Sequence, residues 1–134
     1  MDTGFAGYVH TNFANFKKAV SAGFLPDTIS TDITCYSAYK RGGRYGMTMC
    51  MSMAKVVGMG EEDIFKAVTS SPAKALGKGN AWGYLVPGRR ADIAVFDYTD
   101  EAFCLTDSDG TCLQSDTGYR CVFTVCDGQI VYRG

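Results

Sequence analysis

The pattern of apolar and polar positions predicts a chain that is helical in its first part and β-rich in its second, with the change near residue 80. Residues 12–22 carry apolar side chains at helical spacing and lysines on the outer face, which predicts an amphipathic helix. Either Thr11 or Asn12 can cap its start. A short buried strand is expected to follow over residues 28–31.

Three further helices are expected before residue 80. Residues 47–57 are apolar nearly all round, which is typical of a helix buried on most sides. Residues 61–69 begin with acidic side chains, which suit a helix N-terminus. A short third helix is predicted with Ser71 as its N-cap and Pro72 as its first helical residue.

Beyond residue 80 the apolar side chains take the spacing of strands. The expected strands and strand edges lie at residues 82–85, 91–97, 103–105, 121–126 and 129–132. Asp107–Gly110 and Asp127-Gly128 are the expected turns, and an Asp-Gly pair between two apolar runs is a strong hairpin signal. The first turn also resembles the start of a calcium loop, but Asp116 stands where the loop's last glutamate belongs, so a hairpin turn is favoured.

Composition limits the class of protein. The chain has 134 residues, of which 46% are hydrophobic and 20% charged, as expected of one globular domain with a sizeable core. A net charge of −1, with both signs spread along the chain, gives no basic face for nucleic acid. We expect a cytoplasmic protein, because no apolar run approaches the roughly 18–20 residues that span a bilayer and Met1–Phe5 has no signal-peptide pattern.

Sulfur-containing side chains favour packing over metal binding. None of the cysteines forms a Cys-x-x-Cys pair, and several lie in apolar stretches, so we expect reduced thiols rather than disulfides or a zinc site. Met49, Met51 and Met53 favour a core helix over a soft-metal site, which would want a histidine or clustered spacing. The six cysteines are Cys35, Cys50, Cys104, Cys112, Cys121 and Cys126.

The stretch Asp27–Asp32 is the most informative one for chemistry. Its β-branched residues follow a Pro-Asp turn and end on a carboxylate, which suits a buried strand that presents Asp32 at the mouth of a barrel. The alternative is a strand-end carboxylate that caps a turn. A catalytic metal needs about three or four protein ligands, whereas the chain has one histidine, His10, and no His-x-His. We therefore expect part of a site. The Tyr36–Tyr45 loop is a second candidate, as either a binding loop or a solvated connection.

Several motifs resemble the amidohydrolase superfamily. Residues 24–32 (FLPDTISTD) resemble its eighth barrel strand, nearest to the deacetylase and dihydroorotase-like members. Residues 69–77, followed by 83–97, resemble the superfamily's C-terminal signature. Residues 107–110 and 124–131 resemble the deacetylase-like branch in particular. The resemblance covers almost the whole chain.

This resemblance implies a fold and a chemistry. Members fold as a (β/α)8, or TIM-like, barrel with a small β-sandwich, bind one or two divalent metals, usually zinc, and hydrolyse amide or related C–N bonds other than peptide bonds. The chain is then α+β, with residues 1–79 forming the C-terminal end of the barrel and residues 80–134 a portion of the sandwich. Asp32 corresponds to the aspartate that ligates the metal and moves the proton, so it is both the catalytic and the metal residue that we expect.

The chain also departs from the family pattern. It lacks the His-x-His of the first strand, the bridging lysine of the fourth and the histidines of the fifth and sixth, and Phe5 stands where a histidine is usual. The first hypothesis is a C-terminal fragment of a metal-dependent amidohydrolase for a small-molecule amide, inactive without the missing barrel and unable to bind metal tightly alone. The alternative is a non-catalytic α+β module that acts by oligomerisation or partner binding, with self-association through exposed strand edges.

Overall fold

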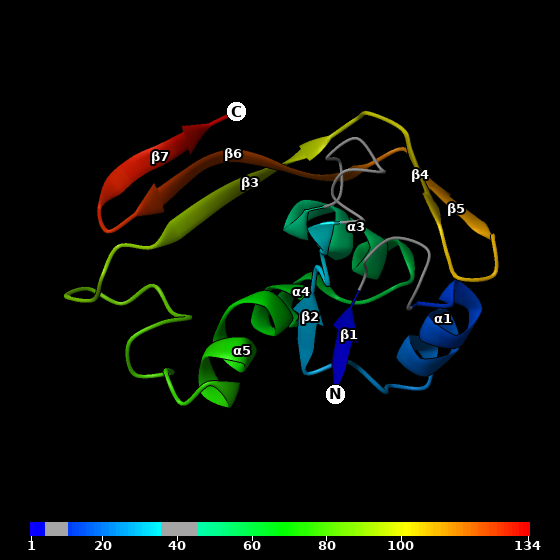
Figure 1. Ribbon diagram of the computed structural model, residues 1–134, viewed down its shortest axis with the longest axis horizontal. Coiled ribbons are helices and arrows are strands. Elements are labelled where there is room, and N and C mark those ends of the chain that lie inside the picture. Colours follow the sequence, from blue (N-terminus) through cyan, green and yellow to red (C-terminus); the bar gives the residue numbers. More distant parts are fainter. Residues whose placement is uncertain (5–10, 36–45) are drawn as a thin grey trace.

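The computed structural model describes residues 1–4, 11–35 and 46–134, and it confirms an α+β chain. Helix α3 lies between a sheet of β3, β6 and β7 on one side and the strands β1 and β2 on the other (Figure 1). In the described residues no helix is long and apolar enough to cross a membrane. The elements in chain order are β1 (Asp2–Gly4), α1 (Phe13–Ser21), β2 (Thr28–Ser30), α3 (Met47–Val56), α4 (Glu61–Val68), α5 (Ser70–Ala75), β3 (Ile93–Thr99), β4 (Phe103–Thr106), β5 (Cys112–Ser115), β6 (Gly118–Cys126) and β7 (Gln129–Arg133).

Helix α1 confirms the amphipathic segment predicted near the N-terminus. Asn12 is its N-cap, and the side-chain Oδ1 accepts a hydrogen bond from the backbone N–H of Asn15 at 2.8 Å. The helix buries Phe13, Phe16 and Val20, which follow the helical spacing of its apolar face. This face joins the main hydrophobic core.

Helix α3 forms the centre of the core, as its nearly all-apolar sequence predicts. Met51, Met53 and Ala54 are fully buried, which confirms that the methionines pack in a core helix. Burial raises the pKa of the Cys50 thiol to about 11, so this side chain acts as a small apolar group. Ser52 is buried as well, and its Oγ donates to the Thr48 carbonyl at 2.7 Å and accepts from the Tyr119 N–H at 2.8 Å. That hydroxyl ties α3 to β6.

The start of α5 corrects a sequence prediction. The helix begins at Ser70 after Thr69, so Ser71 is not its N-cap and Pro72 is its third residue. Helix α4 ends at Val68, and the Thr69 hydroxyl donates to the Phe65 carbonyl at 2.6 Å, which turns the chain directly from one helix into the next. Pro72 is tolerated because the first N–H groups of a helix have no partner inside that helix.

The β-rich second part confirms two predicted hairpins. Strands β4 and β5 pair antiparallel around the Asp107–Gly110 turn, and β6 pairs with both β3 and β7. Asp127 and Gly128 both have positive φ, at 51° and 78°, which is the signature of the tight turn that an Asp-Gly pair favours. Strand β5 was not predicted.

Two expectations for this part are wrong. Residues 82–85 form no strand, because no described strand pairs with them; Gly83 lies instead against Ser70 and Ala73 of α5, and Leu85 is 77% exposed. The cysteines are not all reduced, since Cys104 on β4 and Cys112 on β5 form a disulfide. Their Cα atoms are 6.0 Å apart across the hairpin, a separation that suits a disulfide.

Candidate functional site

The carboxyl ends of two parallel strands form the candidate site. Strand β1 runs beside β2 with Asp2 opposite Thr28 and Gly4 opposite Ser30, and helix α1 makes the crossover between them. Ile29, at the centre of β2, is 3% exposed and joins the core. Because both strands point the same way, their carboxyl ends, Gly4 and Ser30, lie at the same edge of the strand pair.

The structure places Asp32 at this edge, just beyond the short strand that the sequence predicts. Asp32 lies two residues beyond β2, is exposed, and has a φ of 48°, a left-handed conformation that aspartate tolerates better than most residues. Its side chain lies directly against Gly4 at the end of β1. A Cβ added to Gly4 would lie 3.0 Å from the Asp32 Cβ and 3.4 Å from its Cγ.

Hydrogen bonds hold both strands beneath this carboxylate. The buried Thr11 donates from Oγ1 to the Gly4 carbonyl at 2.7 Å, which fixes the end of β1 to the start of α1. The Asp2 carboxylate accepts from the hydroxyls of Thr28 at 2.6 Å and Ser30 at 2.8 Å, across the strand pair. These contacts were not predicted from the sequence. The Asp-x-Gly motif at residues 2–4 was the one local pattern that could have indicated them.

The described residues do not make a metal centre by themselves. Within residues 1–4, 11–35 and 46–134, no three histidine, cysteine, aspartate or glutamate side chains lie close enough to share an ion. Asp32 can supply one of the roughly three or four ligands that a catalytic zinc requires. His10, Phe5 and the Tyr36–Tyr45 loop lie outside the described residues.

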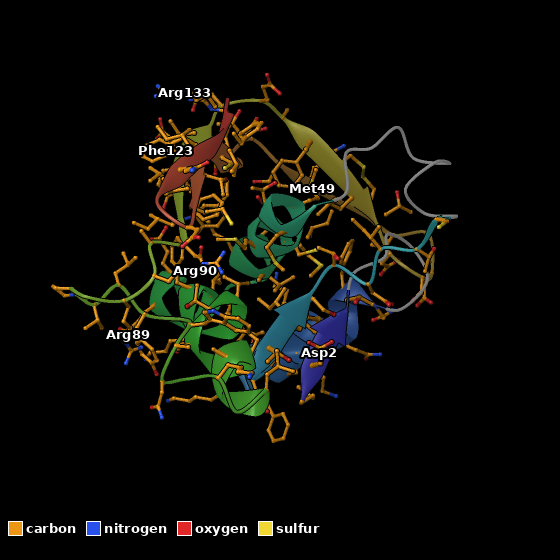
Figure 2. All side chains as sticks on the ribbon, turned by 60° about the vertical axis from the view of Figure 1, so that its left-hand side comes forward. Asp2, Met49, Arg89, Arg90, Phe123 and Arg133 are labelled. Atoms are coloured by element: carbon orange, nitrogen blue, oxygen red, sulfur yellow. A yellow bond between two sulfur atoms is a disulfide. The ribbon has the colours of Figure 1, made fainter. Side chains whose placement is uncertain are left out.

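A separate apolar groove of about 850 Å³ lies between the helices and the β3-β6-β7 sheet. Its lining includes Trp82, Tyr84 and Leu85 together with residues of α4, α5 and β3. Arg90 and Asp92 form an ion pair with a 2.9 Å Nε–Oδ2 separation at the sheet side. Hydrogen bonding from the Asp127 N–H, and from Arg90, holds the pKa of Asp92 below its ordinary value. Figure 2 shows Arg89 and Arg90 on the segment that joins helices and sheet, well away from Asp2 on β1.

Comparisons with known proteins agree with the geometry. The sequence profile of the amidohydrolase family matches residues 6–131. A deacetylase of Brucella anthropi is 33% identical over 110 residues, which covers 82% of this chain, and a deacetylase of Enterococcus faecalis is 31% identical over 119 residues, which covers 89%. The crystal structure of an adenine deaminase superposes on 93% of the chain with a TM-score of 0.78 and 30% identity. That of a dihydroorotase superposes on 96% with a TM-score of 0.79 and 26% identity.

The chain is much shorter than these proteins. It spans 26% and 32% of the two deacetylases, and 33% and 34% of the deaminase and dihydroorotase chains. The similarity nevertheless extends through both the helical part and the β-rich part of the chain.

Proposed function

Because the chain belongs to the amidohydrolase family, we propose that it is the C-terminal part of a metal-dependent hydrolase of amide-type C–N bonds. The observation that carries this proposal is the Asp32 carboxylate at the joined ends of β1 and β2, against Gly4. In this proposal β1 and β2 are the last strands of a (β/α)8 barrel. Residues 1–79 complete that barrel, and residues 80–134 form a portion of a β-sandwich.

Asp32 is the residue of this part of the chain to which we assign chemistry. A carboxylate at the rim of a barrel can act as a metal ligand and can accept or donate a proton. Zinc, when bound in the complete enzyme, would polarise the substrate carbonyl and activate water. The rest of the ligand set would come from residues outside those described, since Asp32 supplies a single carboxylate.

The substrate class follows from the relatives. Two deacetylases are among the proteins similar to this chain. The dihydroorotase and the adenine deaminase are likewise named for the hydrolysis of a C–N bond. We propose a small-molecule amide as the substrate. A cytoplasmic location remains our expectation for such an enzyme.

Sequencing the transcript upstream of Met1 tests the fragment proposal. An in-frame stretch that encodes a barrel with His-x-His supports it, and an unrelated upstream sequence contradicts it. In the longest expressed protein, chelator-sensitive hydrolysis of N-acetyl substrates is then measured for Asp32→Asn. We expect kcat/KM to fall at least about 100-fold, because a positioned acid–base group contributes on that order. The control is Asp100→Asn, an exposed carboxylate after β3, which should leave the rate unchanged.

A second candidate function is binding without catalysis. Strand β7 is exposed along its whole length and pairs with β6 alone among the described strands, with Ile130 49%, Val131 61% and Tyr132 50% exposed. Such an edge favours pairing with another strand, so we propose self-association through β7. Sedimentation velocity over a range of concentrations tests it, and a monomer at every concentration would contradict it.

A further inference from the structure

The turn of the β4–β5 hairpin is hydrogen-bonded to the start of α1. Asp107 is 1% exposed, and its carboxylate accepts three backbone N–H groups: Phe13 at 3.0 Å, Asp109 at 2.9 Å and Thr111 at 2.8 Å. The Ser108 N–H also donates to the Thr11 carbonyl at 3.2 Å. Two parts of the chain that are 94 residues apart in sequence are therefore held together by one turn.

This turn is closed at its base by the Cys104–Cys112 disulfide. The two cysteines are eight residues apart and flank the turn, and both are exposed. Between them Leu105 points inward, is 1% exposed and lies opposite Leu113 on β5. The hairpin thus presents its sulfurs to solvent on one face and its apolar contacts to the core on the other.

We propose that Cys104 and Cys112 are a reversible redox pair that controls how firmly the turn at 107–111 holds the N-terminus of α1. With the disulfide formed, the two strands cannot separate at the turn, so the Asp107 carboxylate stays beneath the Phe13 N–H. With the thiols reduced, only hydrogen bonds and the packing of Leu105 keep the turn in place.

A low-molecular-weight disulfide, such as oxidised glutathione, is the oxidant that this chemistry requires. One cysteine thiolate attacks that disulfide and releases one glutathione thiolate, which leaves a mixed disulfide on the protein. The second cysteine thiolate then attacks the first cysteine's sulfur in that mixed disulfide, which forms the Cys104–Cys112 bond and releases the second glutathione as a thiolate. Two protein thiols are oxidised, one glutathione disulfide is reduced to two thiols, and the released thiolates take up the two protons.

A chain of contacts links this turn to the candidate site. Thr11, which accepts from Ser108, donates its hydroxyl to the Gly4 carbonyl at 2.7 Å. Gly4 in turn lies against the Asp32 side chain. The redox pair is therefore connected to the end of β1 through these hydrogen bonds, and its effect should weaken with each step along this path.

Hydrogen–deuterium exchange of the purified protein tests the proposal. The protein is equilibrated with oxidised glutathione or with dithiothreitol, the 104–112 link is mapped by peptide mass, and exchange is followed at residues 11–20 and 104–113. We expect the Phe13 and Thr111 amides to exchange about tenfold more slowly in the oxidised form. Equal rates in the two forms, or no 104–112 link under oxidising conditions, would overturn the proposal.

Three variants separate the redox effect from general stability. The double variant Cys104→Ser/Cys112→Ser should show the exchange rates of the reduced form in either buffer. Cys126→Ser changes an exposed free cysteine on β6, and it should keep the full redox response. Asp107→Asn should still form the disulfide but lose the protection of Phe13 in both redox states, because the ionised carboxylate that binds that amide is gone. Redox-dependent exchange at Phe13 that persists in the double serine variant would contradict the assignment to this pair.

Discussion

The two hairpins of the β-rich part both turn at an Asp-Gly pair, but the β4–β5 hairpin packs against the core whereas the β6–β7 hairpin is exposed to solvent. In β4–β5 the side chains of Leu105 and Asp107 are each 1% exposed, and the turn binds helix α1. In β6–β7 the turn and the whole of β7 are exposed, and Val131 is 61% exposed. Figure 1 shows the β4–β5 hairpin above α1, whereas β7 forms the outer edge of the other sheet. Local turn residues specify the reversal of the chain, and distant contacts decide whether a hairpin belongs to the core.

Truncating one apolar side chain in each hairpin should give the largest difference. Leu105→Ala leaves a cavity in the core and should lower the free energy of unfolding by about 2–5 kcal/mol. Val131→Ala should change it by less than about 0.5 kcal/mol, because that side chain is already in solvent. Urea denaturation measures both values. Equal losses would mean that β7 is covered in solution.

The attachment of β6 at its start can be tested through Ser52. Ser52→Ala removes the acceptor of the Tyr119 N–H, and Tyr119 is 7% exposed, so the amide is left buried without its partner. We expect a loss of about 1–3 kcal/mol in unfolding free energy. The control is Ser115→Ala on β5, whose hydroxyl donates to the nearby Thr117 carbonyl at 2.8 Å in an exposed position. A control loss as large as that of Ser52→Ala would refute the importance of this anchor.

Acid should loosen the β4–β5 hairpin selectively. The Phe13 N–H, followed by the turn amides, holds the pKa of Asp107 below its ordinary value of 3.8. A carboxylate whose folded pKa is lowered stabilises the fold above its unfolded pKa, and this contribution is lost as the pH falls through the folded pKa. Asp107→Asn should therefore flatten the pH dependence of stability below about pH 4. Thermal melts between pH 2 and 6 measure this, and an unchanged profile would argue against the role of Asp107.

Placing a charged side chain on β7 should have the smallest effect on the free energy of unfolding. It should have a clear effect on self-association. Val131→Lys should leave the free energy of unfolding within about 0.5 kcal/mol of the parent. It should lower self-association, because a lysine on an edge strand opposes pairing with another strand. Phe24→Lys replaces another exposed apolar residue, 66% exposed and distant in sequence from β7, and serves as the control in sedimentation velocity. Equal association of both variants would exclude β7 as the contact.

Local signals predicted most of the elements. The helical spacing of apolar residues gave α1 and α3, because an amphipathic or all-apolar helix is visible within a dozen residues. The Asp-Gly turn predicted the β6–β7 hairpin for the same reason. The position of Asp32 at a strand end was also visible, because a short β-branched run ended on a carboxylate.

Features that depend on distant partners were not predictable. The apolar residues at 82–85 have the composition of a strand, but no described strand pairs with them and Leu85 is 77% exposed. The disulfide requires knowledge that Cys104 and Cys112 face the same side of a hairpin whose second strand the sequence did not reveal. Asp107 similarly looked like an ordinary turn residue, and its partner Phe13 lies 94 positions earlier.

The contact between Gly4 and Asp32 has a consequence for the variation that the protein tolerates. A methyl group at position 4 would meet the Asp32 Cβ at 3.0 Å, tighter than nine in ten such contacts, so the Asp32 side chain would have to shift by a few tenths of an ångström. In a saturation library that scores hydrolysis, alanine at position 4 should therefore be depleted while asparagine at position 32 is depleted independently. The absence of a side chain at position 4 therefore leaves the room that the Asp32 side chain occupies.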